Sequence, residues 1–196
     1  MRAASIRPRL ELPDRAVARE RLGTLLRERS LREGVEVVLA SGKRSDVYVD
    51  GKQVTLDGEG LFLVASLILR QMEGERVTAV GGLTLGADPI ASGVAMLSHL
   101  AGAPVRAFLV RKEPKKHGTQ RTLEGTLAST DRVVLVDDVI TTGGSILKAA
   151  EAVRAVGATV AFVSVVVDRE DPDGQTALAP LDYRPIFRLS ELRARR

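Results

Sequence analysis

The chain has 196 residues, 44% of them hydrophobic, which suits one α/β domain with a buried core and argues against wholesale disorder. It has no cysteine and two histidines, which excludes disulfides, thiolate catalysis and metal sites built from cysteine or several histidines. Residues 1–34 carry the whole formal charge of +4, which we interpret as an Arg/Glu-rich surface helix; a nucleic-acid contact is the alternative, and we do not expect it.

The N-terminus lacks the apolar core of a signal peptide. The longest apolar run, residues 61–69, is too short to span a bilayer. We therefore expect a soluble, cytoplasmic protein without a membrane partner.

Residues 1–72 are predicted to form an N-terminal helix and a small hood. Asp14 is expected to cap a helix that runs to about Leu31, with Gly34 closing it. Residues 35–39 and 47–49 have the composition of short strands, joined by a polar turn at 41–45. Asp57 is expected to begin a second helix, which contains the apolar run 61–69.

Residues 73–196 are predicted to form the α/β core of what is one structural domain overall. Apolar runs at 77–80, 105–110, 133–136 and 159–167 are rich in valine and do not alternate with polar residues, as in parallel strands buried on both faces. Helical patterns at 88–100 and 144–156 separate them in pairs. This alternation indicates a mostly parallel sheet flanked by helices.

The connection between the second and third core strands is long, polar and without a helical period. It contains Pro114 and Gly118, and it is rich in cations. Such a loop in a compact domain is typically a lid, a binding loop or a disordered segment. Its basic candidates are Arg111, Lys112, Lys115 and His117. The alternative is a solvated basic loop.

The most informative segment follows the third core strand. Two carboxylates, Asp137 and Asp138, precede a loop of threonine and glycine that leads into a helix. Backbone N–H groups at the glycines and at the helix start, with nearby hydroxyls, suit a phosphate monoester. The carboxylates instead suit vicinal sugar hydroxyls or a divalent cation. The candidates are Asp137, Asp138, Val139, Ile140, Thr141, Thr142, Gly143, Gly144 and Ser145.

The nucleotide-binding patterns G-x-x-x-x-G-K-[ST] and G-x-G-x-x-G are absent from the sequence. A plain helix-capping loop is the structural alternative. A ligand with a 5-phosphate on one side and ribose hydroxyls on the other satisfies both halves of the segment.

Residues 134–145 resemble the phosphoribosyl-diphosphate (PRPP) binding motif of type I phosphoribosyltransferases. The loop 111–118 and the segment 41–50 resemble those of the orotate phosphoribosyltransferase family, and residues 81–89 resemble its diphosphate-contacting loop. The resemblance implies the type I phosphoribosyltransferase fold. It also implies a Mg²⁺-dependent glycosyltransferase that converts orotate and PRPP to orotidine 5′-monophosphate and diphosphate in de novo pyrimidine (UMP) biosynthesis.

The resemblance also implies residue roles. Lys115, His117 and Asp138 would be catalytic, and PRPP would contact residues 137–145 together with Arg111, Lys112, Lys115 and His117. Orotate would contact Thr141, Arg169 and Tyr48. Mg²⁺ would be held mainly through PRPP, with no direct protein ligand. A homodimer is implied, in which Arg111, Lys115 and His117 reach the neighbouring subunit's site.

The chain departs from many relatives at two positions where they carry lysine, here Ala40 and Leu85. Lys43 or Arg44 are candidates to replace the lost charge. Three alternatives stay open: Arg169 in a surface salt bridge, Tyr48 in hood packing, and a phosphoribosyltransferase for another base. A regulator that binds PRPP as an effector is a further reading from a different class.

Overall fold

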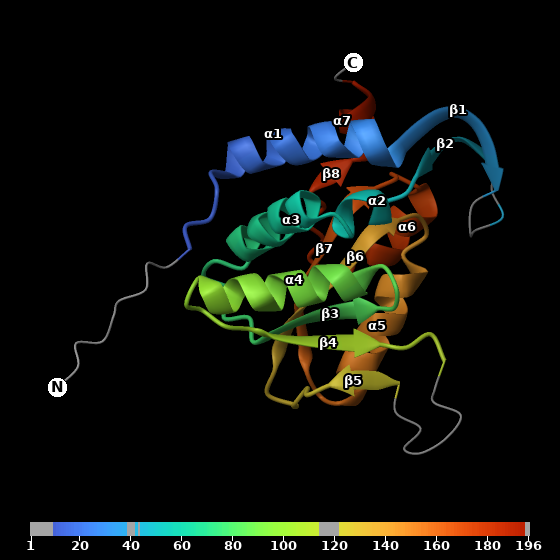
Figure 1. The fold of residues 1–196 in the computed structure, drawn as a ribbon. Helices are drawn as coiled ribbons and strands as arrows, with labels where there is room; N and C mark the ends of the chain where they lie inside the picture. Colours follow the sequence, from blue (N-terminus) through green and yellow to red (C-terminus); the bar gives the residue numbers. More distant parts are fainter. Residues whose placement is uncertain (1–9, 39–41, 43, 114–121, 195–196) are drawn as a thin grey trace.

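A six-stranded sheet forms the centre of the molecule (Figure 1). The computed structural model describes residues 10–38, 42, 44–113 and 122–194. The elements, in chain order, are α1 (Arg15–Leu25), the π-helical turn η1 (Leu26–Ser30), β1 (Leu31–Val38), β2 (Arg44–Val49), α2 (Lys52–Thr55), α3 (Gly58–Gln71), β3 (Ala79–Leu83), α4 (Ala87–Leu100), β4 (Arg106–Val110), β5 (Leu123–Gly125), β6 (Arg132–Ile140), α5 (Gly144–Ala155), β7 (Thr159–Asp168), α6 (Pro172–Leu178), β8 (Phe187–Arg188) and α7 (Leu189–Arg193).

The strand order is β5-β4-β3-β6-β7-β8, and every pairing is parallel except that of β4 with β5. The predicted mostly parallel α/β sheet is therefore confirmed. The long connection after β4 is not wholly without structure, because Leu123 pairs with Val110 and begins an antiparallel edge strand. Three residues are too short a strand to give a periodic signal in the sequence.

Both faces of the sheet are buried, which explains the unbroken apolar runs. Along β6, Val134 and Val136 belong to one hydrophobic cluster with α1, α3 and α4. Val133 and Leu135 belong to a second cluster with α5. Because successive side chains of a strand point to opposite faces, a strand covered on both sides needs apolar residues at every position.

The predicted N-caps are confirmed. Asp14 accepts hydrogen bonds from the Ala16 and Val17 amides (2.8 and 3.2 Å), and Asp57 accepts one from the Gly60 amide (3.0 Å). Carboxylates at these positions satisfy amides that have no partner within the helix.

The first helix ends within one residue of the predicted position, but the prediction that Gly34 closes it is wrong. The helical segment stops at Ser30, and Leu31 already begins β1, where it pairs with Val49 and is buried. Gly34 lies inside β1, where the register with β2 shifts, and does not close a helix. Pairing with β2 starts β1 at Leu31 and not at the predicted residue 35, and local sequence cannot show such pairing.

The β1–β2 hairpin forms a separate two-stranded sheet that extends from the body of the molecule (Figure 1). The first hydrophobic cluster joins residues on both sides of position 72, such as Leu22 and Ile68 with Val94 and Val134. The division into a hood (1–72) and a core (73–196) stays a prediction. Among the described residues, no helix has the length and apolar character needed to cross a bilayer.

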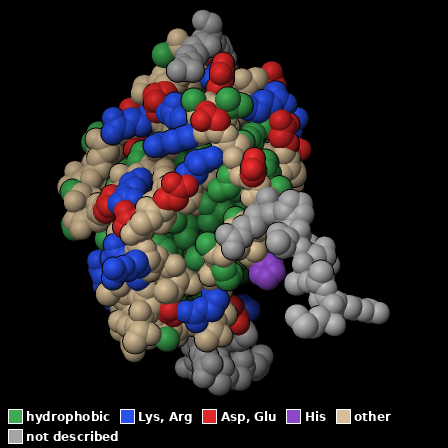
Figure 2. All heavy atoms as spheres, turned by 90° about the vertical axis from the view of Figure 1, so that its left-hand side faces the viewer, with side chains coloured by type: hydrophobic (Ala, Val, Ile, Leu, Met, Phe, Trp, Pro, Cys, Tyr) green, Lys and Arg blue, Asp and Glu red, His purple; other side chains and the backbone are tan. Residues whose placement is uncertain are grey.

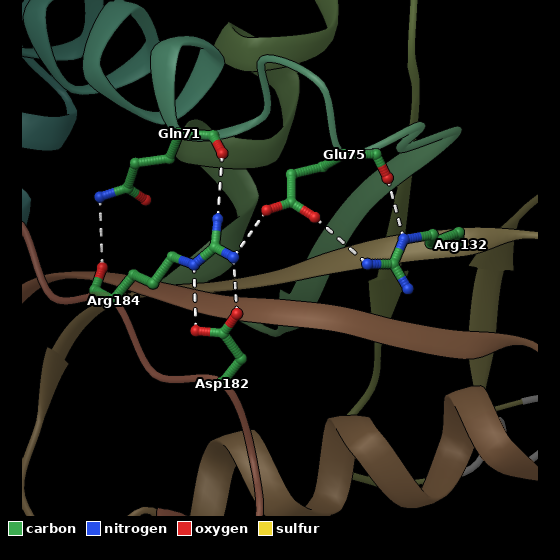
Figure 3. Close-up of polar contacts among 5 residues, drawn as sticks. All are labelled: Gln71, Glu75, Arg132, Asp182 and Arg184. Atoms are coloured by element: carbon green, nitrogen blue, oxygen red, sulfur yellow. Dashed lines mark hydrogen bonds and ion pairs between the residues drawn. The ribbon is translucent and has the colours of Figure 1, made fainter.

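Two features lie near the amino ends of the core strands. Hydrophobic side chains gather on the face shown in Figure 2, at a cavity of about 370 Å³ lined in part by Leu69, Met72, Val77 and Val105. Nearby, Arg184 forms the polar network of Figure 3 with Gln71, Glu75, Asp182 and Arg132.

Candidate functional site

The acid pair Asp137–Asp138 lies near the carboxyl end of β6. The strand continues past the pair to Ile140, because β6 pairs with β7 as far as Ile140 and Asp168. The sequence predicts that the strand ends in the two acids, and the structure extends it beyond them to Ile140. The consequence is deep burial: the two aspartates are only 6% and 5% exposed.

A hydroxyl, a backbone amide and an ammonium group donate hydrogen bonds to the pair. The Ser145 hydroxyl donates to Asp137 Oδ2 (2.6 Å), and the Asp138 amide donates to Asp137 Oδ1 (3.0 Å). Lys52 Nζ donates to Asp138 Oδ2 (2.8 Å). Burial, together with repulsion from Asp138, raises the pKa of Asp137 to about 7, although the Ser145 hydrogen bond opposes the change. At neutral pH Asp137 is therefore protonated in about half of the molecules.

The loop between β3 and α4 lies directly against this pair. A Cβ at Gly86 would lie 2.0 Å from Asp137 Oδ1 and 2.5 Å from Asp138 Oδ1. Only glycine permits so close an approach. The segment 81–89, which resembles a diphosphate-contacting loop, is thus brought against the acid pair.

The loop after β6 leads into an open helix start. Gly143 has φ +80° at the N-cap of α5, and no side chain caps this helix. The first N–H groups of a helix have no partner within it, and with the helix dipole they favour an anion. Thr141, Thr142 and Ser145 are half-buried around this position, so hydroxyls and free helix amides lie close together in sequence, a combination suited to a phosphate group.

Arg169 joins the site to the hairpin. Its amide donates to Ile140 O (3.1 Å), and its Nη2 donates to Ser45 Oγ (3.0 Å) and Val47 O (2.9 Å). Partial burial lowers its pKa, while the charge of Asp171 opposes that change. Tyr48, next along β2, is 40% exposed. The two acceptors of the Arg169 guanidinium, the Ser45 hydroxyl and the Val47 carbonyl, are both neutral oxygens.

Other predicted cations are engaged elsewhere or lie outside the described residues. Arg44 pairs with Glu36 on the hairpin, and both side chains are largely exposed. Arg111 Nε pairs with Glu124 Oε1 (2.7 Å) across β4 and β5. Lys112 is exposed, and its carbonyl accepts a hydrogen bond from Lys148. Residues outside the described ranges are Ala40, Lys43, Lys115 and His117.

Sequence reasoning missed Lys52, the cation that contacts the acid pair. It lies on the one-turn helix α2, two residues after the segment 41–50 that resembles the family. A lysine after Asp50 and Gly51 carries no motif of its own. Only the placement of α2 against β6 gives it a partner 86 residues away.

The requirement for Mg²⁺ stays a prediction, and the carboxylate oxygens of the acid pair are the ligand type that this ion prefers. Within the described part of the chain, no three His, Asp or Glu side chains gather as a set of metal ligands. One oxygen of Asp138 is already engaged by Lys52, and one of Asp137 by Ser145. Mg²⁺ is commonly bound through substrate phosphates and water, with few protein ligands.

Comparison with known proteins identifies the family. Residues 63–178 match the model of the phosphoribosyl transferase domain. The orotate phosphoribosyltransferase of Rhodopseudomonas palustris (strain BisB18) is 43% identical over 183 residues, covering 90% of this chain and 97% of the relative.

Solved structures agree. A crystal structure of Mycobacterium tuberculosis H37Rv orotate phosphoribosyltransferase, in complex with Fe(III) dicitrate, has a TM-score of 0.76 at 39% identity. A structure of that enzyme in complex with PRPP has a TM-score of 0.72 at 36% identity. Each comparison covers 89% of this chain and 98% of the other. The fold is that of the type I phosphoribosyltransferases, and the chain belongs to the orotate phosphoribosyltransferase family.

Proposed function

We propose that this protein transfers the 5-phosphoribosyl group of PRPP to orotate, which gives orotidine 5′-monophosphate and diphosphate for pyrimidine biosynthesis. The observation that carries the proposal is the buried acid pair at the end of β6, followed by the uncapped start of α5, within the region that matches the family.

The two halves of this site suit the two ends of a phosphorylated ribose. The amides and hydroxyls of residues 141–145 would hold the 5-phosphate. Asp137 and Asp138 would accept hydrogen bonds from the ribose hydroxyls, and a protonated Asp137 could also donate one. Charge-assisted hydrogen bonds of this kind fix position as well as add affinity.

In the reaction, the bond between ribose C1 and the diphosphate oxygen breaks, and its electron pair leaves with the diphosphate. A ring nitrogen of orotate forms the new bond to C1 and gives up its proton. Negative charge gathers on the leaving group, so catalysis needs cations held in place around it. Arg111 and Lys112 at the end of β4, with Lys115 and His117 beyond them in sequence, would supply that charge.

Arg169 would bind the carboxylate of orotate. A guanidinium presents several N–H donors, and its contacts with Ser45 and Val47 employ only Nη2. Tyr48 and Thr141 would border the base. Because a neutral base offers no carboxylate, the partly buried guanidinium favours an acidic pyrimidine.

Mg²⁺ would arrive with the diphosphate of PRPP, and its chemistry is to neutralise charge on the leaving group. The protein itself would place the ribose hydroxyls against Asp137 and Asp138 and bind the 5-phosphate at residues 141–145. A cytoplasmic location accords with this proposal, because PRPP is a polyanion that does not cross a lipid bilayer and must be used where it is made.

The direct test is turnover. Purified protein mixed with orotate, PRPP and Mg²⁺ should remove the ultraviolet absorbance band of orotate and release diphosphate, and Asp138→Asn should abolish this. Turnover of uracil or adenine in place of orotate would contradict the substrate. PRPP binding without turnover of any base would instead support a regulator.

We also propose a homodimer in which residues 111–118 of one subunit complete the site of the other. Mixing inactive Lys115→Ala with inactive Asp138→Asn protein should then restore activity. A mixed dimer has one site with both elements intact, and random exchange makes about half of the dimers mixed. If subunits exchange and activity stays absent, the loop acts within its own chain.

A further inference from the structure

We propose that Lys52 is a positioning residue that orients Asp138 through a direct ion pair, so that the acid pair can bind the ribose of a polyanionic substrate. This deepens the proposed function and rests on it for the identity of the substrate. The observation is the contact between Lys52 Nζ and Asp138 Oδ2 at 2.8 Å, across 86 residues of sequence.

Asp138 is enclosed on three sides. A Cβ at Gly51 would lie 2.8 Å from Asp138 Cβ, and a Cβ at Gly86 would lie 2.5 Å from Asp138 Oδ1. Lys52 contacts the remaining oxygen. The loops before α2 and α4 and the ammonium of Lys52 therefore determine together where this carboxylate points.

The two side chains of the ion pair differ in their exposure to solvent. The Asp138 side chain is 7% exposed, whereas that of Lys52 is 43% exposed. Partial burial lowers the pKa of Lys52, but the hydrogen bond and charge of Asp138 raise it further, so the ammonium stays charged. A buried carboxylate is thus paired with a cation that reaches it from the more exposed side.

The charge also matters for the incoming ligand. PRPP brings a phosphate and a diphosphate toward two adjacent carboxylates, and like charges repel. Lys52 offsets the charge of Asp138 at the point of contact.

The experiment is calorimetric binding of PRPP and Mg²⁺ in the absence of any base. The buffer contains 0.3 M salt to screen the general attraction of a cation for a polyanion. Lys52→Met keeps most of the side-chain length and removes the charge. It should weaken PRPP binding by about tenfold or more, as expected for a hydrogen bond to a charged group. Lys52→Arg should recover most of the affinity.

Arg154→Met serves as the matched control, because Arg154 is exposed in the last turn of α5 and its loss removes one positive charge away from the acid pair. It should leave PRPP affinity unchanged. Thermal melting of each variant separates loss of binding from loss of fold, and Lys52→Arg keeps the test informative if Lys52→Met folds poorly.

The decisive comparison uses the Asp138→Asn background. If Lys52 acts through Asp138, adding Lys52→Met there should change PRPP affinity by less than about threefold, because interacting residues have non-additive effects. An equal loss in both backgrounds would show direct contact with the substrate and overturn the positioning role. Unchanged affinity of Lys52→Met in the wild-type background would overturn it as well.

This test does not depend on the base. Wild-type protein that binds PRPP but fails to consume orotate would contradict the proposed reaction and leave the role of Lys52 measurable. Wild-type protein that does not bind PRPP would overturn both.

Discussion

Two charged regions lie near opposite ends of the same sheet. In one, opposite charges are paired; in the other, two carboxylates are adjacent. Near the amino ends, Arg184 contacts Asp182 through Nε and Nη2 (3.0 and 2.6 Å) and Glu75 through Nη2 (2.6 Å), and Arg132 contacts the same Glu75 (3.2 Å). At the carboxyl ends, two carboxylates are adjacent, and a half-exposed lysine, Lys52, pairs with only one of them, Asp138.

Their protonation follows from this difference. Hydrogen bonds from arginine lower the pKa of both Glu75 and Asp182. Burial raises the pKa of Asp137 to about 7. Arg184 and Arg169 also differ in pKa. Hydrogen bonds to carboxylates raise the pKa of Arg184. Burial lowers the pKa of Arg169, whose hydrogen bonds go to neutral oxygens.

The contrast separates structural from functional charge. A network in which each charge meets its opposite ties segments together and leaves little for a ligand to gain. Adjacent carboxylates, and a partly buried guanidinium whose hydrogen bonds within the described residues go to neutral oxygens, are unfavourable in the free protein and can be compensated by a substrate. The following variants test this distinction, from the largest expected effect to the smallest.

Replacing both Asp137 and Asp138 by asparagine should have the largest effect on PRPP. Two charge-assisted hydrogen bonds to ribose would be lost, at about 1.5–3 kcal/mol each. Binding and turnover should fall together while the fold survives, since the change also removes a buried like-charge pair. Calorimetry with PRPP and circular dichroism would check this, and unchanged PRPP affinity would remove the acid pair from the site.

Arg169→Leu should act on orotate rather than on PRPP. Removing one partner of a buried charge pair costs about 2–5 kcal/mol, so the orotate KM should rise by well over tenfold and the preference for orotate over uracil should narrow. Steady-state kinetics with both substrates would measure it. If orotate kinetics are intact, Arg169 serves only to hold Ser45 and Val47 of the hairpin.

The two regions should respond to pH with opposite sign. Asp137 has a folded pKa of about 7, above the unfolded value of about 3.9, so the folded state binds more protons between those values. Its contribution to the free energy of unfolding therefore declines as pH rises from about 4 to 7, by a few kcal/mol in total.

Asp137→Asn should remove that decline, and urea denaturation of wild type and variant from pH 3 to 8 would show it. Glu75 and Asp182 have lowered pKa values, so their contribution is present above about pH 4 and is lost as pH falls further. A wild-type minus Asp137→Asn difference that is flat across pH 4–7 would contradict the raised pKa.

Arg184→Met should have the smallest effect and a purely structural one. It removes contacts with Glu75 and Asp182 and the stacking of the guanidinium on Phe162, 4.2 Å from the ring centroid. Because the side chain is about one-third exposed, we expect roughly 1–2 kcal/mol of lost stability. Urea denaturation checks this; a change in the KM of PRPP or orotate would break the distinction between the two regions.

The sequence by itself determined the elements whose signals are local. The buried strands were visible as valine-rich runs, because a sheet covered on both faces requires them. Asp14 and Asp57 were visible as helix caps, since a cap acts within three residues. The segment 137–145 was visible because its acids, threonines and glycines are contiguous in the chain.

The tertiary structure decided what depends on distant partners. It began β1 at Leu31 and placed Gly34 inside the strand, because Leu31 is buried by pairing with Val49. It extended β6 through the acid pair by pairing it with β7. It brought Lys52 to Asp138 and Arg169 to Ser45, 86 and 124 residues apart in the chain. Such contacts arise from packing of whole elements, and no local pattern of residues encodes them.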